Sequence, residues 1–132
     1  MIYLDSNIFI YACLNLEETG KRSRDLLRSV ETGKIEAASS TLSFNEIVWA
    51  VKKYRTVEQA TVAGEAFINM PRLNLVPVDE TVIRSAIDLM RKYKFDPRDS
   101  IHAASAFQCH AEALISKDQH FDRLKEVPRR LF

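Results

Sequence analysis

Short apolar runs alternate along the chain with longer segments in which apolar residues recur every three or four positions. The short runs predict strands and the periodic segments predict helices. Strands are expected at residues 2–4, 35–38, 73–76 and 113–116, with a terminal edge strand at 127–131. Helices are expected at residues 7–13, 22–31, 43–54, 57–70, 79–93 and 97–109, with a short helical turn at 119–124. This alternation predicts an α/β fold, with helices on both faces of a mainly parallel sheet of four to five strands.

The length and composition fit one ordinary domain spanning residues 1–132. The chain is 46% hydrophobic and 28% charged, with only three glycines, so no flexible linker is visible. It shows neither a signal peptide nor an apolar run near the roughly 18 residues of a membrane span, so we expect a cytoplasmic protein without membrane contact. Cys13 and Cys109 lie far apart in helical patterns, and we expect them to be small core residues rather than disulfide partners or zinc ligands.

The net charge of +1 excludes a strongly basic nucleic-acid-binding protein, so the distribution of charge matters more than its sum. Three basic clusters occur along the chain: Lys52, Lys53 and Arg55; Arg91, Lys92, Lys94 and Arg98; and Arg123, Lys125, Arg129 and Arg130. Each cluster alone is typical of a solvated helix face. They would form a phosphate-binding rim only if the fold brought them around one cleft.

Acidic residues recur at strand ends and helix starts, where open α/β sheets build active sites. Asp5 and Asp118 follow predicted strands, and Glu46 and Asp99 lie in the first turns of predicted helices. If the fold gathers these acids, their repulsion requires a counter-charge, since two like charges about 4 Å apart cost roughly 4 kcal/mol at an effective dielectric near 20. Carboxylate oxygens suit Mg²⁺ or Mn²⁺, and such a cluster indicates phosphodiester chemistry.

Each acid also has a purely structural interpretation. Asp5 and Asp118 can cap the helix that follows, Glu46 can complete a capping box with Ser43, and Asp99 carries a charge that a helix N-terminus favours. The three histidines are expected to be structural or to lie at the rim of a site, because hydrolysis by a metal-activated water requires no histidine. They are His102, which shares a helix face with Asp99, and His110 and His120.

Four segments together resemble one known family. They are Ile-Tyr-Leu-Asp-Ser-Asn-Ile-Phe at 2–9, Ser-Phe-Asn-Glu-Ile around Glu46, Asp-Ser-Ile-His-Ala-Ala-Ser-Ala from Asp99, and Ile-Ser-Lys-Asp-Gln-His-Phe-Asp from Ile115. The order and spacing of these segments resemble the PIN-domain ribonucleases, most closely the VapC toxins of toxin-antitoxin systems. The resemblance covers nearly the whole chain.

The resemblance implies an α/β/α sandwich, cleavage of single-stranded RNA with one or two Mg²⁺ or Mn²⁺ ions, a homodimer and a small antitoxin partner. It places Asp5, Glu46, Asp99 and Asp118 at the metal-binding and catalytic positions, with Asp5 and Asp99 as the first choice for direct ligands. It places Ser6 or Asn7, and Ser116, at supporting polar positions, and Asp122 at a frequent but less constant fifth acidic position.

Two alternatives remain open at the level of sequence. A haloacid-dehalogenase-like phosphatase would also begin with a strand followed by Asp5, but it requires a second aspartate where this chain has Asn7. A catalytically silent PIN-like module that binds RNA or protein would share the fold, although such modules usually lack one or more of the acids. Dimerisation receives weak support from aromatic residues that we expect to be exposed: Phe44, Trp49, Tyr54 and Phe67.

Overall fold

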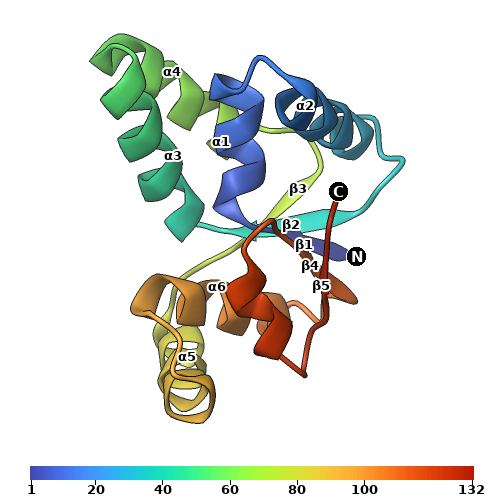
Figure 1. Ribbon diagram of the computed structural model, residues 1–132, viewed down its shortest axis with the longest axis vertical. Coiled ribbons are helices and arrows are strands. Elements are labelled where there is room, and N and C mark those ends of the chain that lie inside the picture. The colour runs from blue at the N-terminus through green and yellow to red at the C-terminus, as the bar shows by residue number, and fades with distance from the viewer.

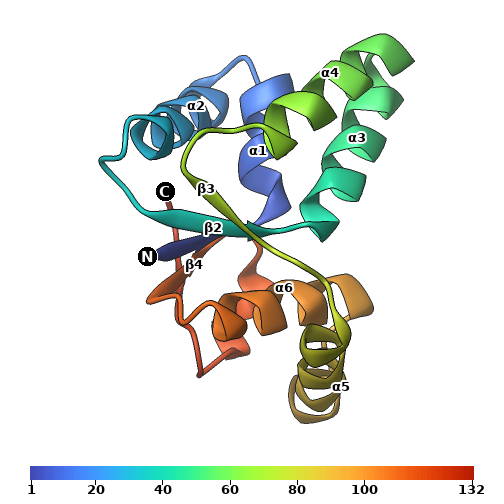
Figure 2. The same cartoon turned by 180° about the vertical axis from the view of Figure 1, so that it is seen from behind.

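The computed structural model, which describes residues 1–132, contains one sheet of five parallel strands between two layers of helices (Figures 1 and 2). The strand order is β3-β2-β1-β4-β5. The strands are β1 (Ile2–Leu4), β2 (Ala37–Ser40), β3 (Leu73–Val76), β4 (Ala113–Ile115) and β5 (Arg129–Arg130). The predicted α/β/α sandwich is confirmed, and the sheet is wholly rather than mainly parallel.

Four helices cover one face of the sheet, and two helices with a short 3₁₀ turn cover the other (Figures 1 and 2). The first face carries α1 (Ser6–Leu14), α2 (Glu18–Glu31), α3 (Leu42–Tyr54) and α4 (Val57–Ile68). The second carries α5 (Glu80–Tyr93), α6 (Pro97–Gln108) and η1 (Gln119–Arg123). Each face has its own apolar core, and the central strand β1 serves both, because Tyr3 packs into one core and Leu4 into the other.

The register of the central strands brings two distant parts of the sequence together. β1 lies between β2 and β4, and Leu4 pairs with Ile115. The backbone N–H of Asp5 also donates to the carbonyl of Ile115 over 3.1 Å. The residues that follow β1 and β4 therefore emerge side by side at the carboxyl edge of the sheet, where parallel α/β sheets bind ligands.

Helix α6 packs closely against the sheet because its inner face is made of small side chains. Ala103, Ala104, Ser105 and Ala106 have no exposed surface. The helix starts at Pro97, as the sequence predicts, but the expected cap is absent, since the Asp96 side chain forms no capping hydrogen bond. This close approach carries the first turn of α6, with Asp99, to the edge of the sheet.

Two elements differ from the sequence prediction in ways that local chemistry explains. Helix α2 begins at Glu18 rather than residue 22, because the Asn15 side chain accepts hydrogen bonds from the N–H groups of Glu17 and Gly20 at the helix start. A side chain at position 20 would collide with the backbone of Asn15. Strand β2 runs later than the predicted 35–38, because Ser39 is accommodated in the interior by donating its hydroxyl to the carbonyl of Leu4.

Three predictions about exposure are wrong. Cys13 is exposed and Cys109 is only half-buried, so neither is a core residue. Phe67 was expected on the surface but is 2% exposed, because its ring packs edge-on against Phe9. Phe44, Trp49 and Tyr54 are exposed as expected. None of the helices combines the length and the hydropathy that a membrane span requires.

Candidate active site

Asp5 is held at the centre of the carboxyl edge by residues from two neighbouring strand ends. Its carboxylate accepts a hydrogen bond from the N–H of Ser6 (2.7 Å) and another from the hydroxyl of Ser116 (2.7 Å). The Ser116 hydroxyl oxygen in turn accepts from the Asn7 amide and from the N–H of Asp118. Asp5 is thus both the cap of α1 and a buried carboxylate, bonded directly by Ser6 and Ser116, while Asn7 contacts it only through Ser116.

Glu46 reaches the same edge from α3 and is held by a histidine. The capping-box interpretation of Glu46 is wrong, because α3 begins at Leu42 without a side-chain cap and the Ser43 hydroxyl bonds with Ser39 instead. One Glu46 oxygen lies 2.5 Å from Nε2 of His102, and Arg98 approaches the other to 3.8 Å.

His102 links two of the acids from inside the protein. It is 1% exposed, its Nδ1 hydrogen-bonds with the Tyr3 hydroxyl over 2.6 Å, and its Nε2 lies 3.6 Å from Asp5 as well as beside Glu46. The ring therefore stands between the carboxylates of Asp5 and Glu46, where a positive charge offsets their repulsion.

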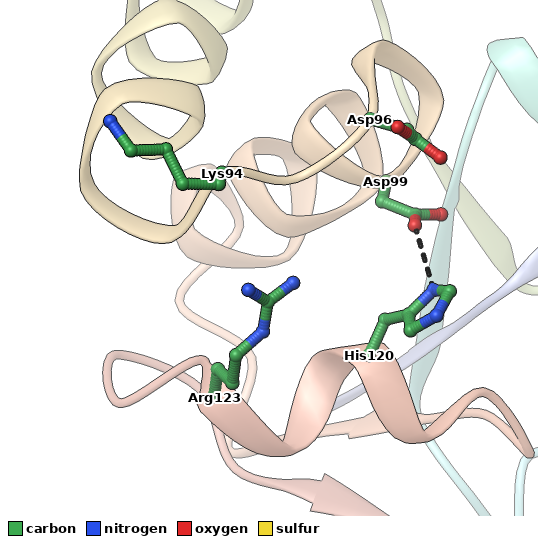
Figure 3. A pocket seen from close by; sticks show the side chains of 5 residues that line it. All are labelled: Lys94, Asp96, Asp99, His120 and Arg123. Carbon is green, nitrogen blue, oxygen red and sulfur yellow. Dashed lines mark ion pairs between the residues drawn. The ribbon is translucent and has the colours of Figure 1, made fainter.

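Asp99, in the first turn of α6, and Asp118, at the start of η1, lie close to each other. Asp118 caps η1 by accepting from the N–H of His120, and its carboxylate also lies close to Asp99. Nδ1 of His120 lies 3.5 Å from Asp99 and 3.2 Å from Asp118. Figure 3 shows the His120 ring facing the Asp99 carboxylate. One ligand atom from each of these three residues lies within 4.8 Å of the others.

The pKa values of these groups record how strongly they interact. Burial raises the pKa of Asp5, although the charge of His102 and the Ser116 hydroxyl oppose the shift. Burial, followed by the charges of Asp118 and Asp5, raises the pKa of Asp99. Asp5, Asp99 and Asp118 therefore share one electrostatic site.

Glu46 and His102 form the opposite electrostatic arrangement. Burial opposes the charge of Glu46, but the hydrogen bond and charge of His102 outweigh it, and the pKa of Glu46 is lowered. Burial likewise opposes the charge of His102, but Glu46 and Asp5 outweigh it and the pKa of His102 is raised. The pair is thus favoured in its doubly charged form.

The donor set fits a hard divalent cation. Asp99 faces Asp118 without a lysine or arginine partner, so a cation between them would relieve the repulsion that raises the pKa of Asp99. Carboxylate oxygens are ligands that Mg²⁺ and Mn²⁺ share, and the nitrogen of His120 suits Mn²⁺ better than Mg²⁺. Asp122 stays outside this cluster, because its exposed carboxylate pairs with Arg129 at 2.6 Å.

The fold also brings to the site two histidines for which the sequence predicted a structural or rim role, and Tyr3, to which the sequence assigned no role. His102 and Tyr3 support Glu46 from the interior, and His120 joins Asp99 and Asp118. The basic clusters converge only in part, since Arg98 contacts Glu46 while Lys94 and Arg123 line a hollow beside Asp99. The spacing of His102 from Asp99 on one helix face was the signal in the sequence that placed His102 near the site.

The sequence matches the PIN domain family over residues 2–127. The chain therefore belongs to the PIN domain family. This membership leaves the haloacid-dehalogenase alternative without support. A search of curated proteins finds no relative at a significant level of sequence similarity.

Solved structures with this fold include several bacterial VapBC proteins. VapBC2 from Rickettsia felis, bound to a DNA fragment from its promoter, has a TM-score of 0.76 at 20% identity, covering 99% of this chain and 98% of that chain. VapC20 from Mycobacterium tuberculosis, a sarcin-ricin loop cleaving toxin, has a TM-score of 0.77 at 12% identity, covering 95% of each chain. DNA-bound VapBC from Salmonella typhimurium has a TM-score of 0.72 at 19% identity, covering 98% of this chain and 96% of that chain.

Proposed function

We propose that this protein is an endoribonuclease that uses Mg²⁺ or Mn²⁺ to cleave single-stranded RNA. The observation that carries the proposal is the convergence of four acids from separate segments at the carboxyl edge of the sheet: Asp5, Glu46, Asp99 and Asp118. Membership of the PIN domain family supports it, as does the fold shared with VapC20, described as a sarcin-ricin loop cleaving toxin.

In this proposal the acids have two different roles, which follow from their different surroundings. Asp99, Asp118 and His120 are placed to hold a cation, and Asp5 is near enough for its charge to act on Asp99. Bound there, one or two such ions would neutralise the scissile phosphate and lower the pKa of the attacking water. Glu46, kept ionised by His102, is suited to accept a hydrogen bond from that water and orient it.

Cleavage of total RNA tests the proposal directly. The purified protein should cut RNA in Mg²⁺ or Mn²⁺, stop cutting in EDTA, and lose activity when Asp99 is replaced by Asn. Mapping the cut ends would identify the target. Uncut RNA across millimolar concentrations of both metals would favour the catalytically silent module instead.

We further propose that the protein is the toxin of a toxin-antitoxin pair and acts in the cytoplasm. VapBC proteins of several bacteria share its fold over nearly the whole chain. A small antitoxin would block the site, and a basic side chain inserted among the acids could replace the cation, because a guanidinium binds carboxylates well. Growth arrest on expression, relieved by the Asp99→Asn substitution or by a co-expressed neighbouring gene, would support this part.

A homodimer is the assembly that we propose. Phe44, Trp49 and Tyr54 are exposed aromatic side chains on α3, and side chains of this kind are available for contact with a second copy. Light scattering of the purified protein and of a Trp49→Glu variant would measure the assembly directly. A monomer at micromolar concentration would contradict this proposal without affecting the nuclease proposal.

A further inference from the structure

A hollow beside Asp99 is lined by two basic residues, Lys94 and Arg123, that form no ion pair with a carboxylate. Its volume is about 160 Å³, and it is lined by Lys94, Asp96, Asp99, His120 and Arg123 (Figure 3). The ion pairs of the chain involve other basic residues, such as Arg98 with Glu46 and Arg129 with Asp122, and include neither Lys94 nor Arg123. Two basic residues without an acidic partner therefore line the same hollow as Asp99 and His120.

Arg123 is held in place by groups that leave most of its donors free. One terminal nitrogen donates to the carbonyl of Tyr93 over 2.6 Å, and the guanidinium lies 5.0 Å from the centre of the Phe95 ring. A guanidinium has five N–H donors, so the remaining ones are available to another acceptor. Figure 3 shows the group pointing toward the space between Lys94 and Asp99.

Lys94 borders the hollow from an unusual backbone position. It ends α5 in the left-handed conformation, with φ 58°, where glycine or asparagine is usually found. The residue is exposed and forms no ion pair, and Figure 3 shows its side chain extended away from Asp99, so the flexible chain must turn toward the hollow to meet a bound group.

We infer that Arg123 and Lys94 bind a backbone phosphate of the RNA next to the scissile phosphate, an inference that rests on the proposed function. A fixed guanidinium with free donors is suited to two-point binding of phosphate, and a flexible ammonium adds a second charge. The acids repel the RNA backbone, whereas these two cations attract it on one side of Asp99. They thereby set the register in which the strand passes the acids.

RNA binding by cleavage-deficient protein tests the inference. The parent is the full chain with Asp99→Asn, and the probe is a fluorescent, mixed-sequence, single-stranded RNA whose binding is followed by anisotropy over a range of KCl concentrations. The variants are Lys94→Gly, which suits the left-handed backbone, and Arg123→Gln. The matched control is Lys125→Gln, an exposed lysine of the same basic cluster that lies outside the hollow.

Each of the two variants should lower the salt dependence of binding, the slope of log K against log[salt], by about 0.7, the value for one lost contact with a single strand. That change corresponds to about fivefold weaker binding at about 0.1 M salt. Lys125→Gln should change neither quantity. Circular dichroism would establish that the variants are folded, and Lys94→Gly keeps the test open if Arg123→Gln is not.

Unchanged affinity and slope in both variants would overturn the subsite while leaving the nuclease proposal intact. An equal loss in Lys125→Gln would also overturn it, because general attraction by positive charge would then explain the binding. A parent that binds no RNA would overturn it as well. The nuclease proposal falls with it only if the unsubstituted protein also leaves total RNA uncut.

Discussion

Asp99 is an acid whose charge the folded protein disfavours when no cation is bound. Its pKa is raised by burial and by the charges of Asp118 and Asp5, so the folded state favours the protonated carboxyl more than the unfolded chain does. A raised pKa of this kind means that the ionised group destabilises the fold above the unfolded value of 3.8, and that the penalty disappears below it.

Asp99→Asn should therefore stabilise the metal-free protein while abolishing cleavage. Asparagine resembles the neutral acid and removes the repulsion with Asp118, so at neutral pH in EDTA we expect a gain of about 1 kcal/mol, or about 4 °C in Tm for a chain of this size. Differential scanning calorimetry with and without EDTA measures the effect. Asp122→Asn is the matched control, because Arg129 lowers the pKa of Asp122 and its removal should bring no gain. A fall in Tm for Asp99→Asn would contradict this account.

His102, by contrast, should stabilise the fold, because its buried ring forms hydrogen bonds with both the Tyr3 hydroxyl and Glu46. Replacing it by leucine leaves the Tyr3 hydroxyl and Glu46 without their partner, and an unsatisfied buried polar group costs about 1 to 3 kcal/mol. We expect His102→Leu to lower the free energy of unfolding by about 3 kcal/mol, measured by urea denaturation. His110→Asn provides the control, since His110 is exposed with φ 56°, which asparagine tolerates. Equal stability of the two variants would exclude a structural role for the His102 network.

At the scale of elements, the helix starts show which capping motifs are real. The sequence Ser43 to Glu46 fits a capping box, but tertiary contacts take both side chains elsewhere. A true capping box starts α4, where the Thr56 hydroxyl accepts from the N–H of Gln59 and the Gln59 side chain accepts from the N–H of Thr56. Both sites have the same local pattern, so only the surroundings distinguish them.

Thr56→Ala should lower the free energy of unfolding by about 1 kcal/mol, because the first turn of α4 loses its cap. Urea denaturation followed by circular dichroism measures the change. Glu17→Ala is the comparison, since Glu17 precedes α2 without a side-chain capping bond and its loss should be nearly neutral. If the two variants proved equally stable, the cap of α4 would contribute nothing measurable.

At the scale of the whole molecule, a cation should join segments that are far apart in sequence. Mg²⁺ or Mn²⁺ that binds only the folded protein stabilises it by about 1.4 kcal/mol at ten times Kd, which corresponds to about 5 °C in Tm. We expect a saturable rise in Tm in a thermal-shift titration, reversed by EDTA and absent in Asp99→Asn. Because the pKa values of Asp5 and Asp99 are raised, the effect should fade at a higher pH than ordinary aspartates would allow. A Tm independent of both metals at neutral pH would refute the metal site.

The fold could be predicted because its elements are encoded locally. Apolar runs and helical periodicity indicated every strand and helix, and Leu73–Val76 was placed without error. Boundaries moved where a contact outside the pattern intervened, as Asn15 does at the start of α2 and Leu4 does for Ser39 in β2. Exposure was harder to predict, since Phe67 and Trp49 are both aromatic residues of amphipathic helices and only packing buries the first.

The sequence by itself determined the alternation of strands and helices, and it placed each acid at a strand end or in a first helical turn. Both are properties of short segments, which local propensity and capping chemistry control. Only the tertiary structure decided which strands are neighbours, and thus that Asp5 and Asp118 emerge side by side. It alone placed His102 between two carboxylates and Arg123 beside Asp99, because contacts between residues distant in sequence depend on how the layers pack.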